Sequence, residues 1–342
     1  MTTAPAAATL QQGTHHVLMI GDCCIRMCEI PDTSIHFACF SPPYYNAPFD
    51  SPNMFENYTA FKHLLSIVGD ELKRVLVPGR KCAWVVDDVR VNGELYPIVA
   101  DTIRIMCDKG FRYCENITWL KAEGYSRFSH RSGHMKKQGL PTYYFPDNVK
   151  ESILIFQKGK LNNGTYVKAL SPAVVKASRI DLNKFDKESW NLNVWFIPNV
   201  PPVKGRLEEG IAAYPEEIPK RLIRLYSFVG ETILDPFCGS GTSMKVARQL
   251  GRNSIGIEIL PELEVVIRQK AAFQHWRERQ SDTFEVISPM HSPYRVSLPL
   301  DKTHVIAQRL GQRAIGIELN PKYCEMFRQR CASAAKPSRR RV

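Results

Sequence analysis

Residues 231–259, ETILDPFCGSGTSMKVARQLGRNSIGIEI, decide the fold class. An apolar run ends in Asp235, a glycine-rich turn reaches Thr242, and a helical pattern leads to a second apolar run that ends in Glu258. A strand, a turn, a helix and a second strand within about 30 residues form a βαβ unit. This stretch therefore predicts a parallel sheet with helices packed against it.

The turn has the composition of a ligand site. Gly239 and Gly241 lie between the strand and the helix, where a missing Cβ lets a ligand approach the backbone. Glu258 stands about 20 residues after Asp235, the spacing at which dinucleotide-type folds place an acid on ribose hydroxyls. No Gly-Lys-Ser/Thr follows, so the turn is not a phosphate-binding P-loop. An acid at Asp235 would repel phosphate but suits a ligand with an ammonium and a sulfonium. A turn that binds nothing is the alternative for the bare Gly-Ser-Gly.

Strands and helices alternate through the rest of the chain as well. The run IHFACF at 35–40 suits a strand that is buried on both faces of a parallel sheet. The patterns predict strands at 17–20, 35–40, 82–88, 152–158, 231–234 and 254–259, and helices at 23–29, 58–77, 96–107, 216–227 and 243–250. We therefore expect an α/β fold with a mostly parallel sheet.

A second motif, Ser41-Pro42-Pro43-Tyr44, follows the strand at 35–40. Exocyclic amino groups of bases are poor nucleophiles, so a site must orient the nitrogen and accept its hydrogens. The Ser41 hydroxyl and the Pro42 carbonyl are suitable acceptors, and two prolines would keep them preorganised. Tyr44 offers a face for stacking an extruded base. The loop has no cysteine, which disfavours covalent methylation at a ring carbon. An ordinary turn is the alternative.

Together the two motifs resemble those of amino-methylating DNA methyltransferases, in the beta class, whose catalytic motif precedes the cofactor motif. The resemblance covers about residues 17–158 and 194–270. It implies a Rossmann-like S-adenosylmethionine-dependent methyltransferase fold, with a largely parallel seven-stranded sheet and helices on both faces. It implies a catalytic loop of Ser41, Pro42, Pro43 and Tyr44. The cofactor-binding residues that it implies are Asp22, Asp235, Pro236, Phe237, Gly239, Ser240, Gly241, Thr242 and Glu258.

The resemblance also bears on the neighbouring segments. Tyr214-Pro215 and the helix after it resemble the part of the family that helps to bind the methionine end of the cofactor. The family often has a histidine a few residues earlier, where this chain has Gly210. A target recognition region would fall in or near 121–193.

The first residue of the catalytic loop bears on the product. Serine is common there in N4-cytosine enzymes of this family, and aspartate in N6-adenine enzymes. We therefore predict that Ser41 belongs to an enzyme that methylates N4 of cytosine in double-stranded DNA, within a restriction-modification system that can include a companion endonuclease. An N6-adenine enzyme is the alternative. Methyltransferases for RNA or protein amides use a similar loop but usually carry the cofactor motif first. A catalytically inactive DNA-binding relative is disfavoured by the two intact motifs.

The charge balance and one basic segment point to DNA as the partner. The chain has 46 lysines and arginines against 34 acids, a net charge of +12, which favours a polyanion. Within the predicted loop 121–150, cations alternate with aromatic residues, a mixture that suits phosphate anchoring and base stacking. The candidate DNA-contacting residues are Arg127, Arg131, Lys136 and Lys137. A solvated basic loop is the alternative.

The motifs divide the chain into five parts. The predicted parts are a disordered lead-in (1–16), a catalytic half (17–158), a target recognition insert with a linker (159–205), a cofactor-binding half (206–272) and a tail (273–342). In the tail, Gly311–Ala332 repeats Gly251–Ala272, with Glu318 at the place of Glu258. The second copy lacks a glycine-rich turn upstream, so we expect one cofactor per chain and a tail that packs on the sheet edge or helices.

The remaining composition excludes several classes. Cys23, Cys24 and Cys28 lie near His15 and His16 but lack zinc-finger spacing, so no metal is expected. Most of the ten cysteines lie in apolar runs and are expected to be free thiols. No apolar run reaches the roughly 18 residues that span a bilayer, and no signal peptide is apparent. We expect a cytoplasmic enzyme.

Overall fold

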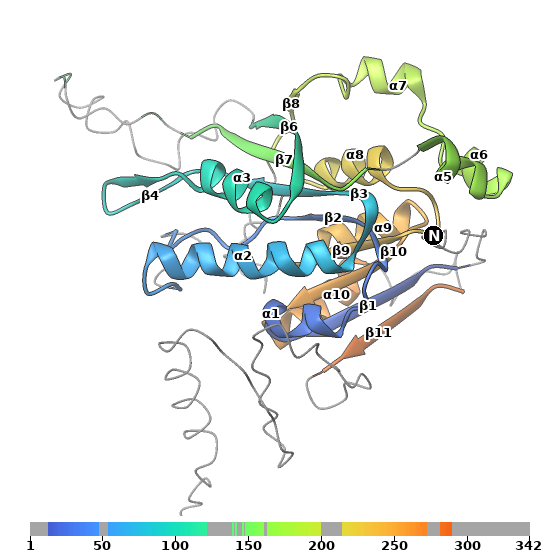
Figure 1. Ribbon diagram of the computed structural model, residues 1–342, viewed down its shortest axis with the longest axis horizontal. Helices are drawn as coiled ribbons and strands as arrows, with labels where there is room; N and C mark the ends of the chain where they lie inside the picture. The colour runs from blue at the N-terminus through green and yellow to red at the C-terminus, as the bar shows by residue number, and fades with distance from the viewer. Residues whose placement is uncertain are drawn as a thin grey trace, which may run out of the picture. The chain divides into compact units, whose positions relative to one another are not determined.

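The computed structural model describes residues 13–47, 54–121, 139, 141, 146, 148–160, 163–199, 214–271 and 281–288. Within these ranges a nine-stranded sheet has the order β11-β1-β10-β9-β2-β3-β7-β6-β8 (Figure 1). Every pairing is parallel except those that β7 makes with β3 and β6. The predicted α/β fold with a largely parallel sheet is confirmed, and the sheet has two strands more than the expected seven.

The bounds of most elements lie close to the predicted ones. The sheet strands are β1 (His15–Ile20), β2 (Ile35–Phe40), β3 (Leu76–Val86), β6 (Phe111–Leu120), β7 (Lys150–Lys158), β8 (Val194–Phe196), β9 (Thr232–Asp235), β10 (Asn253–Glu258) and β11 (Thr283–Ile287). A separate hairpin pairs β4 (Val89–Val91) with β5 (Glu94–Tyr96). The helices are α1 (Cys23–Arg26), α2 (Tyr58–Val75), α3 (Ile98–Asp108), α5 (Asn163–Ala169), α6 (Pro172–Ala177), α7 (Leu182–Lys187), α8 (Glu217–Tyr226), α9 (Thr242–Gln249) and α10 (Glu264–Lys270), with 3-10 turns η1 (Met27–Glu29) and η3 (Pro261–Leu263).

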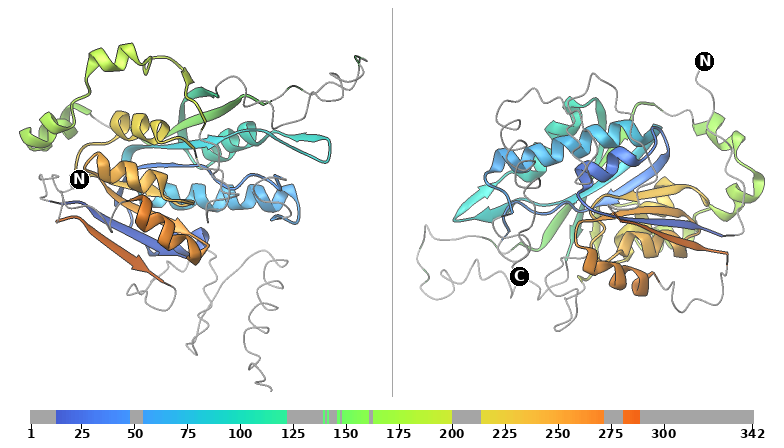
Figure 2. Two further views of the ribbon diagram at one scale, coloured as in Figure 1. Left: turned by 180° about the vertical axis from the view of Figure 1, so that it is seen from behind. Right: turned by 90° about the horizontal axis from the view of Figure 1, so that it is seen from below.

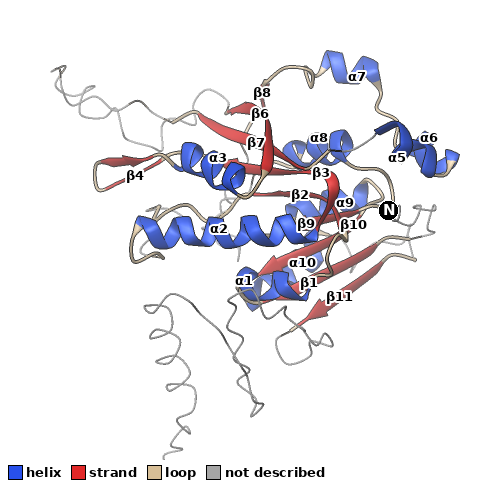
Figure 3. Ribbon diagram, viewed as in Figure 1, coloured by secondary structure: helices blue, strands red, loops and turns tan. Residues whose placement is uncertain are grey.

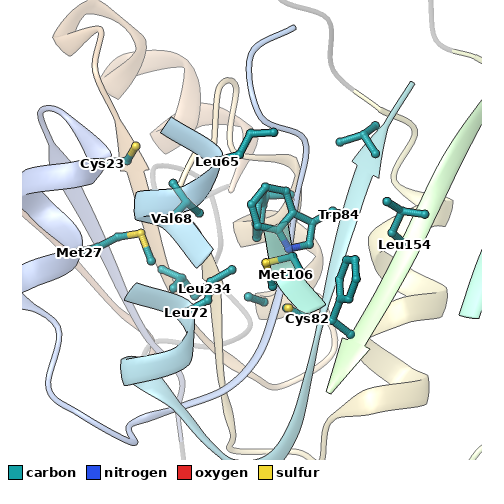
Figure 4. Packing of buried hydrophobic residues seen from close by; sticks show 14 of the residues in the cluster. Cys23, Met27, Leu65, Val68, Leu72, Cys82, Trp84, Met106, Leu154 and Leu234 are labelled. Atoms are coloured by element: carbon teal, nitrogen blue, oxygen red, sulfur yellow. The ribbon is translucent and has the colours of Figure 1, made fainter. Parts of the chain in front are cut away.

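Helices cover both faces of the sheet, as Figures 2 and 3 show. Successive strand residues point to opposite faces, so β2 sends Ala38 and Phe40 to one side and Phe37 and Cys39 to the other. The first side packs against α1, α2 and α3, and the second against α8 and α9. Figure 4 shows part of the first layer, where Trp84 of β3 lies among side chains of α2 and β7. This double burial explains why IHFACF is apolar apart from His36.

The short strands β4, β5 and β8 and the tail strand β11 were not predicted, and β3 and β6 differ from the prediction for identifiable physical reasons. β3 begins at Leu76, directly after α2, and continues through Pro78 and Gly79, where its pairing with β2 shifts register. β6 was not predicted, because its exposed residues in RYCENI hide the alternation of a strand. β6 is held by nine residue pairs with β7 and by Trp119, whose indole N–H donates to the Ile197 carbonyl at 2.8 Å.

The predicted insert at 159–205 contains three short helices and β8 among its described residues. Its first half is fixed at the amino end of β9. The Tyr166 hydroxyl bonds Glu231, and the Ser178 hydroxyl accepts from the Val229 N–H at 2.9 Å. Its last strand, β8, pairs with the carboxyl end of β6. The insert therefore extends from the amino ends of the parallel strands to their carboxyl ends.

The first part of the tail belongs to the sheet. β11 pairs with β1, and the Ile287 carbonyl accepts from Arg26 Nη2 at 2.8 Å. Asp282 accepts from Arg248 Nε at 2.8 Å, and both side chains are buried. The second copy of the internal repeat, like residues 1–12 of the lead-in, lies outside the described residues. In the described ranges, no helix has the length and apolar character needed to cross a membrane.

The tail therefore has two parts that truncation should separate. A chain ending at Ser288 keeps β11, and we expect it to melt at a higher temperature than a chain ending at Ala272. A chain ending at Ala272 loses Asp282, which forms a buried ion pair with Arg248, and the Ile287 carbonyl that accepts from Arg26. Removing one member of a buried ion pair costs about 3 kcal/mol or more. Thermal unfolding measures the difference. Equal melting temperatures for both truncations would contradict a structural role for 281–288.

Candidate active site

The carboxyl ends of five neighbouring parallel strands lie in a row, which we call the carboxyl edge of the sheet. Each of these strands ends in a polar residue or is followed closely by one. In strand order these are Asp22 after β1, Glu258 on β10, Asp235 on β9, Ser41 after β2 and Asp87 after β3. Ligands of open parallel sheets bind outside this carboxyl edge. The strand order therefore places both sequence motifs on the binding edge, although about 190 residues separate them in the chain.

The glycine-rich turn after β9 requires its glycines. Gly239 and Gly241 have φ angles of 51° and 80°, in the left-handed region that favours glycine. A Cβ on Gly241 would lie 2.9 Å from Cγ2 of Ile267. The Gly239 N–H donates to Oε2 of Glu258 at 2.8 Å, and the Cys238 N–H donates to the Ile257 carbonyl at 2.9 Å. The turn is thus fixed to β10 and presents backbone, without side chains, at the edge.

Asp235 lies at the centre of a buried hydrogen-bond cluster. Its side chain is 3% exposed and accepts from the Ser243 hydroxyl at 2.5 Å, the Tyr214 hydroxyl at 3.2 Å and the Phe237 N–H at 3.0 Å. Burial, only partly offset by these hydrogen bonds, raises the pKa of Asp235 from 3.8 to about 6. The site thus keeps a buried carboxylate whose negative charge a cationic ligand would stabilise. Sequence reasoning had not found Ser243.

Glu258 ends β10, and Asp22 follows the neighbouring strand β1. The Glu258 carboxylate is 7% exposed and also accepts from the Leu260 N–H at 3.0 Å, and burial raises its pKa. The Gly21 N–H donates to the Glu258 carbonyl at 2.8 Å, which brings the following Asp22 close. Asp22 is exposed and caps α1 by accepting from the Cys24 N–H at 2.8 Å. Two acids thus border the same edge, one buried and one open.

The other predicted residues of the turn pack or form hydrogen bonds within the protein, and their role in cofactor binding stays a prediction. Pro236 and Thr242 are buried, and Thr242 begins α9. The Ser240 hydroxyl accepts from Lys270 Nζ at 2.6 Å. Phe237 packs its ring against Phe40, with centroids 5.8 Å apart. Because Phe40 directly precedes Ser41, this contact joins the turn to the catalytic loop.

The catalytic loop is fixed by two hydroxyl groups. The Ser41 hydroxyl donates to the Val85 carbonyl at 2.9 Å, which leaves its oxygen lone pairs as acceptors. The Tyr44 hydroxyl donates to Oε2 of Glu151 at 2.9 Å. Burial and the nearby negative charges of Glu151 and Asp87 raise the pKa of Tyr44 well above 10, so the phenol stays protonated.

Sequence reasoning missed two acidic residues beside this loop, Asp87 and Glu151. Asp87 is buried, bonds the Asn148 amide and accepts from Lys150 Nζ at 3.2 Å. Glu151 pairs with Lys121, whose Nζ lies 2.6 Å from Oε1. An acid at the end of the strand pattern CAWVVDD was the available signal for Asp87. No sequence signal marked Glu151. β7 runs antiparallel to β3, so its first residues, and not its last, lie at the carboxyl edge.

Some predicted features remain outside this geometry. The candidate DNA-contacting residues Arg127, Arg131, Lys136 and Lys137 lie outside the described residues. Asp22, Cys23 and Cys24 offer three possible metal-ligand atoms within 4.8 Å of one another. Neither neighbouring histidine contributes: His15 and His16 bond Thr283 and Ser254, and burial lowers the pKa of His16 to about 3. That the protein needs no metal stays a prediction. All eight cysteines in the described ranges are free thiols.

Comparison with known proteins is consistent with this geometry. A family model described as DNA methylase, covering N6 and N4 methyltransferases, matches residues 35–269. The chain belongs to this family. The Type II methyltransferase M.MjaI of Methanocaldococcus jannaschii is 32% identical over 295 residues, which cover 77% of this chain and 93% of the relative. The DNA adenine methyltransferase YhdJ of Escherichia coli is 27% identical over 198 residues. This match covers 53% of this chain and 67% of YhdJ.

Among solved structures, TTHA0409 of Thermus thermophilus, in complex with S-adenosyl-L-methionine, is similar with a TM-score of 0.61 and 28% identity. The match covers 80% of this chain and 99% of TTHA0409. The methylase is therefore an S-adenosylmethionine-dependent DNA methyltransferase. The prediction of an amino-methylating DNA enzyme that uses this cofactor is confirmed at that level.

Proposed function

We propose that the methylase transfers a methyl group to N4 of cytosine in double-stranded DNA, at a specific sequence. The observation that supports this product is that serine, and not aspartate, stands first in the catalytic loop, as is common in the N4-cytosine enzymes that the motifs resemble. The Ser41 hydroxyl donates to the Val85 carbonyl and keeps lone pairs that can accept an amino hydrogen. N6 of adenine is the second candidate, favoured by the likeness to YhdJ, whose name gives adenine as its target.

The residues at the carboxyl edge divide into two groups in this proposal. The first holds S-adenosylmethionine, which supplies an electrophilic methyl group on a sulfonium. Asp235, aided by Tyr214 and Ser243, binds the methionyl ammonium, Glu258 binds the ribose hydroxyls and Asp22 lies at the adenine end. The backbone of 239–241 lies against the cofactor.

The second group acts on the target base. The Ser41 hydroxyl and the Pro42 carbonyl accept the amino hydrogens, so the nitrogen lone pair turns toward the sulfonium methyl. Pro43 stiffens the loop, and Tyr44 stacks on the extruded base. Because its phenol stays protonated, Tyr44 contributes its ring face and does not act as a base.

DNA recognition is assigned to the segments that adjoin this edge. We place phosphate and base contacts in 121–150, with Arg127, Arg131, Lys136 and Lys137, and target recognition in 159–205. Within that insert β8 adjoins the carboxyl end of β6, whereas Tyr166 and Ser178 hold its first half at the opposite edge. We further propose a cytoplasmic restriction-modification system with a companion endonuclease, in keeping with the Type II name of M.MjaI.

Product analysis tests the proposed function. DNA from a host that expresses the methylase should contain N4-methylcytosine at one recurring sequence. Mass spectrometry of the digested DNA identifies the base, and methylome sequencing identifies the site. The Ser41→Ala variant is the control, since it should leave the DNA largely unmethylated. Exclusive N6-methyladenine would overturn the N4 assignment, and unmodified DNA would overturn the DNA substrate.

The affinity for S-adenosylmethionine should depend on pH. The cofactor ammonium binds the ionised form of Asp235, whose pKa is about 6 in the free protein. Protonation removes this charge, so affinity should fall roughly tenfold per unit as the pH decreases below 6. Calorimetry between pH 8 and pH 5 measures the trend. The Asp235→Asn variant should bind weakly at every pH, and a flat profile in the unmodified protein would contradict the ammonium contact.

A further inference from the structure

Glu151 of β7 connects the catalytic loop to Lys121, the residue that follows β6 and begins the predicted DNA-contacting segment 121–150. One carboxylate oxygen, Oε2, accepts from the Tyr44 hydroxyl at 2.9 Å. The other, Oε1, lies 2.6 Å from Nζ of Lys121. The Glu151 and Lys121 side chains are only 15% and 13% exposed, so solvent screens this bridge less than a surface pair. Glu151 faces Trp119 across the β6–β7 pairing, which fixes its backbone.

The contact restrains a side chain that would otherwise rotate. Tyr44 is attached to a loop, and rotation about its side-chain bonds would swing the ring away from a base. A hydrogen bond at the far end of the ring fixes both side-chain angles at once. Its charged acceptor makes it stronger than a neutral hydrogen bond. Because the ring is ordered before the base arrives, the loss of its side-chain entropy does not add to the barrier of the reaction.

We propose that Glu151 is a positioning residue that holds the Tyr44 ring in its base-stacking orientation, and that Lys121 keeps the Glu151 carboxylate aligned. The proposal rests on the stacking role proposed above for Tyr44. Glu151 makes no contact in the described structure with Asp22, Asp235 or Glu258. Its loss should therefore reduce turnover and leave cofactor affinity unchanged.

A double-mutant cycle tests whether Glu151 acts through Tyr44. The variants are Glu151→Ala, Tyr44→Phe and their combination, assayed for methyl transfer from labelled S-adenosylmethionine to the chain's own recognition sequence. Tyr44→Phe keeps the ring and removes only the hydroxyl. Each single variant should lower kcat roughly 10- to 100-fold, the range expected for one charged hydrogen bond. The double variant should be no slower than the slower single variant, because both remove the same contact.

Two further variants separate positioning from stability. Glu151→Gln keeps an oxygen acceptor for Tyr44, so it should lose less activity than the alanine variant. It also replaces the alanine variant in the test if that protein does not fold. Asp70→Asn breaks an ion pair of similar length but greater exposure, in which Lys109 Nζ lies 2.7 Å from the carboxylate of Asp70 on α2. We expect it to retain full activity. S-adenosylmethionine affinity should stay within about twofold of the unmodified protein in all four single variants, since none removes a cofactor contact.

Three results would overturn the positioning role. They are an unchanged kcat in Glu151→Ala, losses that multiply in the double variant, and equal losses for the Gln and Ala variants. Failure of the proposed function gives a different result: the unmodified protein would transfer no methyl group to DNA. If it instead methylated RNA or protein, the cycle on that substrate would still report the coupling of Glu151 to Tyr44.

Discussion

Replacement of Glu258 by alanine should lower the affinity for S-adenosylmethionine by roughly 100-fold or more. Two ribose hydroxyls would lose a charged acceptor, at roughly 1.5–3 kcal/mol for each bond. The same carboxylate accepts from the Gly239 N–H, so its loss also releases the glycine-rich turn that lies against the cofactor. Isothermal titration calorimetry measures the change.

Two variants make this result interpretable. Glu258→Gln keeps an acceptor for Gly239 but removes the charge, so its affinity should fall between those of the unmodified protein and the alanine variant. Glu262→Ala removes an exposed acid four residues away and should bind normally. Undiminished affinity in Glu258→Ala would show that the ribose lies elsewhere, and the acid of the internal repeat, Glu318, would then be the residue to replace.

Replacement of Tyr44 by alanine should reduce turnover roughly 100-fold or more while S-adenosylmethionine still binds. Stacking of a base on an aromatic ring contributes roughly 1–3 kcal/mol, and the variant also abolishes the hydrogen bond to Glu151. Single-turnover methylation of DNA measures the rate, and calorimetry measures cofactor binding in the same preparation.

The neighbouring tyrosine supplies a contrast. Tyr45 is buried against the rings of Tyr58 and Phe61, so Tyr45→Ala should lower the melting temperature more than Tyr44→Ala, because Tyr44 is only partly buried. If Tyr44→Ala methylated DNA at the normal rate, the stacking role would be wrong. If it lost cofactor binding instead, Tyr44 would belong to the cofactor site.

The sequence alone determined the local parts of this protein. The chain 231–259 encodes a βαβ unit because strand, turn and helix signals act over a few residues, and the glycine-rich turn can be recognised without the rest of the fold. The same holds for IHFACF, whose apolar residues, interrupted only by His36, already indicate burial on both faces. Local patterns also marked the ends of strands, where Ser41, Asp235 and Glu258 lie.

Tertiary structure alone decided which of these ends meet. Ser41 and Asp235 are neighbours because β2 pairs directly with β9, a choice made by long-range strand pairing that no local signal records. Glu151 reaches the catalytic loop only because β7 runs against the other strands. β11 joins the sheet because β1 offers an open edge and Arg248 offers a partner for Asp282. Sequence periodicity reports which face of an element is buried, whereas hydrogen bonds between distant strands determine what is buried against it.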